Sequence, residues 1–303
     1  MYDDIRYLLV VVLSFFMLGA CADDTLRQIP TPPAPPLEEE PPPPDQIPPV
    51  AVIAPPAATN VSTPTTLILD GTGSYDSDGQ IVEYRWSLES APNANASTPT
   101  PMGTGKAEII AALVGSYTIG LVVVDNDGLT SQKETVTFNA TPNEAIHVEL
   151  TWDYAENDVD LHLIAPGGAF GDFFLDCHYG NCTPEINSGF FSLVDWGVYG
   201  DASDNPSLDI DNINDIVPEN INLDNPASGE YKVVVNYYYQ GDTGAGAAHP
   251  EVRIYLNGVL HGPFGPVTLN SGCDKWTVAT ISIPGGTVTP DGTLWRSTED
   301  CEP

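Results

Sequence analysis

The chain has 303 residues, of which 9 are Lys or Arg and 42 are Asp or Glu, so its formal net charge at pH 7 is −33. This charge excludes a protein that binds nucleic acid or anionic lipid headgroups, because those partners require clustered Lys and Arg side chains. The length allows about two domains beside a leader and a linker, and 42% apolar residues are enough to build their cores.

The acidic excess has two interpretations, and the sequence leaves both open. Either the acids only keep an exported protein soluble, or they bind cations at one or more sites. Outside a cell, Ca²⁺ is the natural cation for carboxylate oxygens. The cofactor that the sequence suggests is therefore calcium.

Residues 1–21 are predicted to be a targeting segment that takes no part in the fold. The apolar run at residues 8–18 has the length of a signal peptide and is too short to span a membrane comfortably. It ends in Leu18-Gly19-Ala20-Cys21, which resembles the lipobox of bacterial lipoproteins. The resemblance implies that Cys21 is lipidated, becomes the new N-terminus and is the chain's attachment to a membrane.

Two features flank this lipobox. Asp3 and Asp4 offset Arg6, so the leader lacks the positive charge usual before the apolar run. An ordinary signal peptide that happens to contain Cys21 is the alternative. Ala22 follows the cysteine, and the resemblance then implies delivery to the outer membrane, with the head on its periplasmic or surface-exposed face.

Residues 22–49 are predicted to be a disordered linker rich in Pro and Glu. Proline favours extended polyproline II at about 3.1 Å per residue, and Glu38 to Glu40 add self-repulsion. Such a linker is expected to hold a folded head away from its anchor. A docking motif for a proline-reading partner is the alternative.

Residues 50–140 are predicted to form a first β-sandwich. Residues 82–88 alternate Val, Tyr, Trp and Leu with polar residues, and residues 117–123 alternate in the same way. This period of two is typical of half-buried strands. About 90 residues of short strands, with a tryptophan on the third, fit an immunoglobulin-like sandwich.

The same residues resemble the PKD (polycystic kidney disease) domain. The resemblance is carried by residues 70–81, DGTGSYDSDGQI, by Tyr84 and Trp86, and by the Asp-Asn-Asp-Gly turn at 125–128. The family's aspartate-rich segment after the tryptophan is missing, since Ser-Leu-Glu-Ser stands at 87–90. The resemblance implies a non-catalytic spacer or interaction module of extracellular proteins.

The first sandwich contains a candidate calcium site. In this fold the loop after the second strand and the loop before the last strand meet at one end. The first loop holds Asp76 and Asp78, and the second holds Asp125 and Asp127. These carboxylates would repel one another unless a cation joined them, and hard oxygen ligands select Ca²⁺. The alternative is that they form Asx-turns with their own backbone.

Residues 144–288 are predicted to form a second, jelly-roll-like β-sandwich, with residues 289–303 as a tail. The domain opens with residues 146–164, which we interpret as two short strands joined by an acidic loop. On the second of these strands the leucines are expected to face inward, and Asp160 and His162 outward. Further alternating runs lie at residues 207–211, 231–237, 252–256 and 276–283.

This region resembles bacterial β-sandwiches of the pre-peptidase C-terminal and YfaP-like kind. The residues that carry the resemblance are LTWD at 150–153, DVDLH at 158–162, LDID at 208–211 and GEY at 229–231. The resemblance implies an accessory or binding domain that sometimes contains calcium and has no catalytic activity of its own.

The second sandwich also contains a candidate calcium site. Its expected ligands are two aspartate pairs, Asp158 with Asp160 and Asp209 with Asp211. Carboxylate oxygens are the ligands that Ca²⁺ prefers. The alternative is an exposed acidic sheet edge that deters edge-to-edge pairing.

If Cys21 is lipidated, Cys177, Cys182, Cys273 and Cys301 remain. An even number of cysteines in an exported chain suggests disulfides, here with three connectivities. One of them closes a short Cys177–Cys182 loop and leaves Cys273–Cys301 to pin the tail. Zinc binding beside His178 is the rival interpretation, but no four-ligand set of recognisable spacing appears.

No catalytic motif appears, since the sequence has neither an HExxH pair nor a Gly-x-Ser-x-Gly elbow. We therefore expect a non-enzymatic cell-surface module for binding or adhesion, with a glycan, a protein or matrix material as ligand. The alternatives are a structural spacer or accessory subunit of an envelope complex, and a hydrolase whose site the sequence does not reveal. Exposed aromatic residues within 170–200 would favour glycan binding, and buried ones the spacer.

Overall fold

The computed structural model describes residues 46–56, 58–184, 194–212, 218–240 and 246–297. The leader, the lipobox cysteine Cys21 and nearly all of the linker lie outside these residues. The described part consists of strands and loops with a short 3-10 turn, Ala202–Asp204 (η1). The predicted all-β class is therefore confirmed. No helix in the described ranges has the length and hydropathy needed to cross a membrane.

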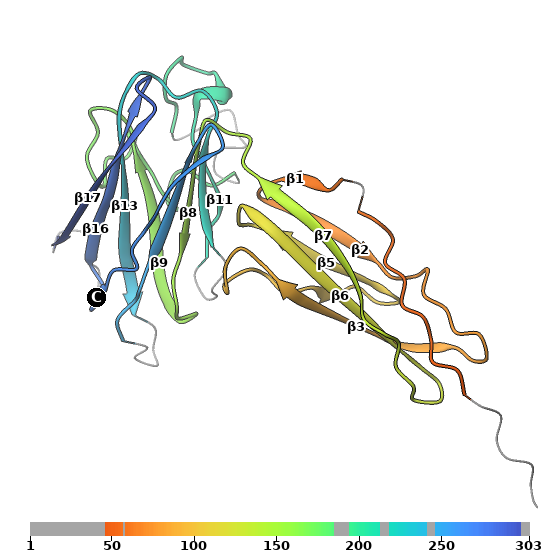
Figure 1. The fold of residues 1–303 in the computed structure, drawn as a ribbon. Coiled ribbons are helices and arrows are strands. Elements are labelled where there is room, and N and C mark those ends of the chain that lie inside the picture. The colour runs from red at the N-terminus through yellow and green to blue at the C-terminus, as the bar shows by residue number, and fades with distance from the viewer. Residues whose placement is uncertain (1–45, 57, 185–193, 213–217, 241–245, 298–303) are drawn as a thin grey trace, which may run out of the picture. The chain divides into compact units, whose positions relative to one another are not determined.

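Strands β1 to β7 form the first sandwich (Figure 1). One sheet has the strand order β1-β7-β6-β3 and the other has the order β2-β5-β4. The bounds are Asn60–Ser62 (β1), Thr65–Asp70 (β2), Ile81–Ser90 (β3), Thr100–Pro101 (β4), Lys106–Ala111 (β5), Gly115–Asp125 (β6) and Glu134–Thr141 (β7).

The core of the first sandwich follows the alternation of β6. Its apolar residues from Tyr117 to Val123 are fully buried at every second position, as expected of a strand with one face on the core. The Tyr117 ring stacks on Phe138 with 5.1 Å between centroids. Its hydroxyl accepts a hydrogen bond from the Leu113 backbone N and donates one to the Leu113 O, each at 3.0 Å.

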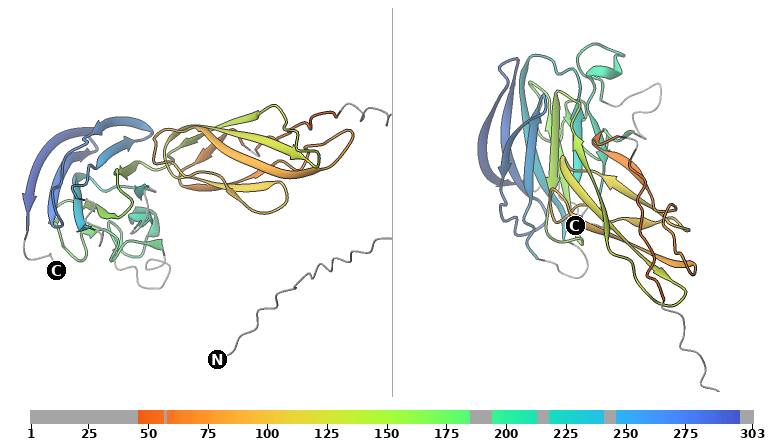
Figure 2. Two further views of the ribbon diagram at one scale, coloured as in Figure 1. Left: turned by 90° about the horizontal axis from the view of Figure 1, so that it is seen from below. Right: turned by 45° about the vertical axis from the view of Figure 1, so that its right-hand side comes forward.

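Strands β8 to β17 form the second sandwich (Figures 1 and 2). Its two five-stranded sheets have the orders β11-β12-β8-β14-β15 and β10-β9-β13-β16-β17. The bounds are Ile146–Thr151 (β8), Asn157–Ile164 (β9), Asp176–Cys177 (β10), Ser207–Ile210 (β11), Glu219–Leu223 (β12), Gly229–Gln240 (β13), Glu251–Leu256 (β14), Val259–Phe264 (β15), Asp274–Ile283 (β16) and Thr287–Arg296 (β17).

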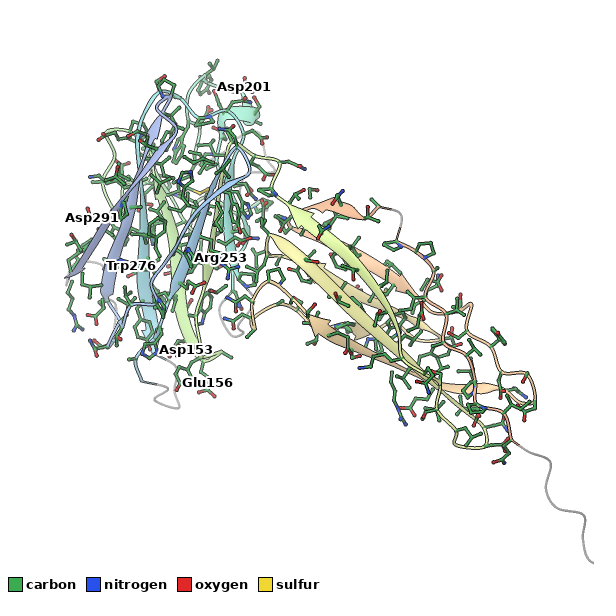
Figure 3. All side chains as sticks on the ribbon, in the orientation of Figure 1. Asp153, Glu156, Asp201, Arg253, Trp276 and Asp291 are labelled. Atoms are coloured by element: carbon green, nitrogen blue, oxygen red, sulfur yellow. A yellow bond between two sulfur atoms is a disulfide. The ribbon has the colours of Figure 1, made fainter. Side chains whose placement is uncertain are left out.

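One core lies between these two sheets. Leu161 and Leu163 of β9 face into it as predicted, beside Val233 and Val235 of β13. Trp276 of β16 belongs to the same core and is labelled in Figure 3. Each of these side chains is almost completely removed from solvent. Burial of this kind supplies the main favourable term for folding.

The opposite face of β9 differs from the prediction. Asp160 and His162 point away from the core but are buried, with exposed fractions of 2% and 4%. Asp158 also lies within the strand rather than in an acidic loop. The expectation of a solvated outer face fails because Phe170 and His178, from the segment after β9, pack against His162.

The second sandwich also continues further than predicted. β17 pairs with β16 as far as Arg296, opposite Asp274, so part of the segment predicted as a tail is a strand of the sheet. Pro290 and Gly292 concealed this strand in the sequence, because both residues are depleted in strands. β17 lies at the edge of its sheet, where proline is tolerated.

Candidate functional site

The edge of β9 carries the most unusual group of side chains in the second sandwich. β10 pairs only with Leu163 and Ile164, so no strand of the described part pairs with this edge of β9 before them. Glu219 of β12 reaches this edge, where its Oε2 accepts a hydrogen bond of 2.8 Å from the Leu161 backbone N. Its Oε1 accepts one of 3.4 Å from the Asn212 N. The Glu219 carboxylate therefore joins the two sheets and lies next to the residues that precede these donors, Asp160 and Asp211.

Four carboxylates gather here, and we call them the acidic cluster: Asp158, Asp160, Asp211 and Glu219. Burial raises the pKa of Asp158 to about 7, and the charge of Asp211 adds to the shift. Burial likewise raises the pKa of Asp160 and of Glu219 well above their usual values, with Asp158 acting on Asp160 and Asp160 acting on Glu219. The pKa of Asp211 is also raised, by partial loss of water around a side chain that still reaches solvent. The charged forms of these groups are therefore mutually unfavourable.

Among the residues that the structure describes, two oxygens at the acidic cluster have no hydrogen-bond partner: Asp158 Oδ1 and Asn236 Oδ1. The exposed fractions of these two residues are 8% and 7%. Asn236 Nδ2 donates to Asp160 Oδ2 at 3.2 Å, which fixes the orientation of the amide. Buried polar atoms without a partner are rare in folded proteins and call for an explanation.

Only part of the predicted aspartate set is brought together. Asp158, Asp160 and Asp211 belong to the acidic cluster, but Asp209 lies elsewhere and accepts hydrogen bonds from Ser207 and Asn222. The cause is a register shift in β11. Leu208 pairs with Ile221 and Ile210 with Asn220, so Asp209 is an extra residue on its strand. Such a bulge interrupts the alternation that would place the two aspartates on one face.

In the first sandwich, the acids are held by their own backbone. Asp125 Oδ1 accepts hydrogen bonds from the N atoms of Asp127 and Leu129, at 2.9 and 2.8 Å. Asp78 Oδ2 accepts one of 3.0 Å from the Ile47 N. Loss of water raises the pKa of Asp76, and the charges of Asp78 and Asp125 contribute. Asp76, Asp78 and Asp125, three of the four predicted ligands, are thus close to one another. Asp127 contributes its backbone N–H as a hydrogen-bond donor. Calcium at this site stays a prediction.

The sequence reasoning missed a second buried polar group on the outer face of β9. Asp176 of β10 accepts hydrogen bonds from His162 Nδ1 at 3.0 Å and from the Gly171 N at 2.8 Å. The His162 ring stacks on His178 with 5.0 Å between centroids. On β16, the Lys275 ammonium lies over the Phe170 ring at 4.9 Å. The alternation of β9 does place His162 on the face of Asp160, but the sequence did not reveal the covering loop.

The described aromatic side chains in the loops after β9 range from buried to exposed, with Phe170 and Tyr179 half-buried. Trp196 is buried, and its Nε1 donates a hydrogen bond of 2.8 Å to the Phe174 O. In contrast, Phe173, Phe174 and Tyr199 have exposed fractions of 54%, 64% and 95%. Both buried and exposed rings therefore occur in this segment: Trp196 anchors the loops, and Phe173, Phe174 and Tyr199 face solvent. We call Phe173, Phe174 and Tyr199 the aromatic surface.

A disulfide pins the same region. Cys177 and Cys182 are bonded, with 5.2 Å between their Cα atoms. Cys273 is also disulfide-bonded, and its expected partner, Cys301, lies outside the described residues. Within the ranges that the structure describes, no three His, Cys, Asp or Glu side chains already stand in a metal-binding arrangement.

Comparison with known proteins identifies the first sandwich. Residues 57–138 match the PKD domain family model. The solution structure of the PKD domain from KIAA 1837 protein is 24% identical, with a TM-score of 0.25, and the match covers 30% of this chain and 83% of that one.

A solved carbohydrate-binding module of the β-sandwich superfamily is 15% identical, with a TM-score of 0.28. That match covers 42% of this chain and 69% of that one. A search of curated proteins finds no match to the chain. The predicted PKD resemblance is thus confirmed for residues 57–138, which form a PKD-like domain.

Proposed function

We propose that this chain is a non-enzymatic binding module of the cell surface whose second sandwich holds a neutral glycan on the aromatic surface. The observation that carries this proposal is the exposure of Phe173, Phe174 and Tyr199. Burying a large apolar side chain is worth about 1.5–3 kcal/mol. Exposed apolar groups that lie together are typical of ligand-binding surfaces; Phe173 and Phe174 are in contact, and Trp196, three residues before Tyr199, is hydrogen-bonded to the Phe174 O.

The loops that carry these rings are fixed in place. Phe173 and Phe174 pack edge to face, with 5.1 Å between centroids. Buried Trp196 holds the Phe174 carbonyl, and Asp201 accepts hydrogen bonds from Ser203 at the start of η1. Figure 3 shows Asp201 at one end of the second sandwich and Asp153 at the other. Rings on fixed loops offer contact area at a low cost in conformational entropy.

Charge narrows the class of ligand. The sequence has no Lys or Arg between Lys133 and Lys232, whereas Asp172, Asp195 and Asp201 lie in the loops of the aromatic surface. A sulfated or uronic-acid polymer would be repelled by these carboxylates. A neutral sugar has an apolar ring face for the aromatic rings and hydroxyl groups that donate to carboxylates. The proposed ligand is therefore a neutral glycan.

The remaining parts of the proposal concern delivery and spacing. A lipid on Cys21 would anchor the chain in the outer membrane, the Pro-rich linker would extend from that anchor, and the PKD-like domain would add a folded spacer. The PKD-like match favours this role for the first sandwich. Mass spectrometry of the membrane-extracted protein tests the anchor, because a lipidated Cys21 would form the mature N-terminus.

Depletion assays on insoluble polysaccharides test glycan binding. The full chain is incubated with neutral polymers and with one uronic-acid polymer, and the unbound protein is measured. Binding to a neutral polymer should fall about tenfold or more in Phe174→Ala and Tyr199→Ala, in line with hot-spot aromatic residues. Tyr75→Ala, at an exposed position in the first sandwich, is the matched control. The proposal is contradicted if the triple variant at Phe173, Phe174 and Tyr199 binds every polymer as well as the wild type does. It is also contradicted if the wild type binds none of the polymers.

A further inference from the structure

The acidic cluster is built by contacts that are independent of the aromatic surface. Glu219 is fully buried, and its two oxygens accept hydrogen bonds from the backbone beside Asp160 and beside Asp211. Asp160 is tied to Asn236 across the β9–β13 pair. Strand positions two apart on β9 put Asp158 on the face of Asp160. The fold therefore places β9, β12 and β13, together with the end of β11, around one group of carboxylates.

Oxygens that lack a partner point to a missing ligand at this place. Asp158 Oδ1 and Asn236 Oδ1 are both buried and find no hydrogen-bond partner within the described part of the chain. Asn236 directs its Nδ2 at Asp160 Oδ2, the arrangement in which the carboxylate oxygen accepts the hydrogen bond. Its carbonyl oxygen is then left as an acceptor that no described group satisfies. Both atoms are acceptors, so the missing ligand is a proton donor or a cation.

Charge compensation favours a cation. Lys275 acts on Asp160, whereas the leading influences on Asp158, Asp211 and Glu219 are burial and, for Asp158 and Glu219, the charges of neighbouring carboxylates. Carboxylates buried together must take up protons or coordinate a metal. The donors are all oxygens, which suits a hard cation, and their number suits Ca²⁺, because Ca²⁺ accepts six to eight oxygen ligands. Mg²⁺ keeps more of its water and demands stricter octahedral geometry.

We propose that Asp158, Asp160, Asp211 and Glu219, together with the Asn236 amide oxygen, bind one Ca²⁺ ion at the edge of β9. This inference goes beyond the proposed glycan binding and stands without it. Asp211 is exposed and offers the route by which the ion enters. These side chains are not already in ligand positions, so the ion draws them together, and Asp211 at the end of β11 is the ligand that moves most.

Isothermal titration of the full chain tests this site. The protein is freed of divalent ions with EDTA and titrated with CaCl₂ and, separately, with MgCl₂ at constant ionic strength. We expect a calcium-binding event that is weakened at least about tenfold in Asp211→Asn, since loss of one ligand from a metal site has effects of this size or larger. Asp209→Asn is the matched control, because Asp209 lies on the same segment but outside the acidic cluster. Its calcium affinity should stay within about threefold of the wild type.

A second variant separates binding from folding. Glu219→Gln keeps an oxygen for the Leu161 N–H and removes one charge, so it should fold and lose the same binding event. The proposal is overturned if the wild type binds no Ca²⁺, if Asp211→Asn binds as the wild type does, or if Asp209→Asn loses binding equally. A calcium event that survives in Asp211→Asn and disappears in Asp125→Asn would assign the ion to the first sandwich and overturn the proposal as well.

Discussion

The Glu219 side chain on one sheet accepts a 2.8 Å hydrogen bond from the Leu161 backbone N on the other. Glu219→Ala leaves this buried N–H without a partner, which costs about 1–3 kcal/mol. Glu219→Gln keeps an acceptor and should change the free energy of unfolding by less than about 1 kcal/mol in EDTA. Urea denaturation measures both values. Equal losses in the two variants would show that the hydrogen bond does not stabilise the fold.

The Tyr117 hydroxyl bridges the N and O atoms of Leu113. This contact resembles the tyrosine corner of immunoglobulin-like sandwiches. Tyr117→Phe leaves both backbone groups without this partner in a buried site, so we expect a loss of about 1–3 kcal/mol in the free energy of unfolding. Tyr75→Phe, at an exposed residue of the same domain, should be neutral. Urea unfolding followed by fluorescence compares the two, and a neutral Tyr117→Phe would contradict the prediction.

The Cys177–Cys182 bond closes a loop with a sequence separation of 5. A loop of this size restricts the unfolded chain by about 2 kcal/mol in the loop-entropy model. The double variant Cys177→Ala and Cys182→Ala should lose stability by about this amount. Chemical denaturation without reductant measures it, since reductant would also open the disulfide of Cys273. Asn181 lies within this loop, and its Nδ2 donates a hydrogen bond of 3.1 Å to the Phe173 O, so binding to polysaccharide should be weakened too. A double variant as stable as the wild type would disprove the stabilising role.

His178 makes stability depend on pH in a defined window. The pKa of His178 is lowered to about 4, mainly by burial and also by the charge of neighbouring His162, while Asp176 opposes the shift. The unfolded side chain titrates near its usual value of about 6.5. Between these values the unfolded state binds more protons, so the contribution of His178 to stability is present above about pH 6.5 and is lost as the pH falls toward 4.

The variant His178→Asn isolates this contribution. His178 Nδ1 accepts a 3.2 Å hydrogen bond from the Gly180 N, and the Asn amide oxygen can replace that acceptor without titrating. We expect the wild type to lose more stability than His178→Asn between pH 7 and about pH 4.5. Urea denaturation at several pH values measures the free energy of unfolding of both proteins. Both have the same carboxylates, so the difference between their profiles reports on His178. Parallel stability profiles would show that His178 is not responsible.

The sequence predicts a feature well where a residue's environment follows from its own strand. The alternation around Tyr117 predicted a buried face correctly, because the sheet covers one side and solvent the other. Asp160 was placed on the correct face of β9, but its burial depends on Asn236 and Lys275 of other strands. Contacts of this kind join residues more than 70 positions apart. The alternation of apolar and polar residues along one strand contains no information about them.

Two local irregularities also escaped the sequence. The bulge at Asp209 costs the strand no apolar contact, since Leu208 stays buried, so the residue pattern does not mark it. Glu219 was missed as a cluster member for a different reason. In the sequence, a single acidic residue before an Asn is typical of the end of a loop. That Glu219 accepts a hydrogen bond from the edge of β9 becomes apparent only in the folded arrangement of β12 and β9.

The first strand of the PKD-like domain pairs with its last. β1 and β7 run parallel, and Asn60, Val61 and Ser62 lie opposite Asn139, Ala140 and Thr141. A pull applied to the two ends of this domain therefore slides these strands past each other. Their hydrogen bonds are loaded together rather than opened one by one. A domain with this connection resists stretching more than one whose terminal strands peel apart, which would suit the proposed binding head if the proposed anchor came under tension.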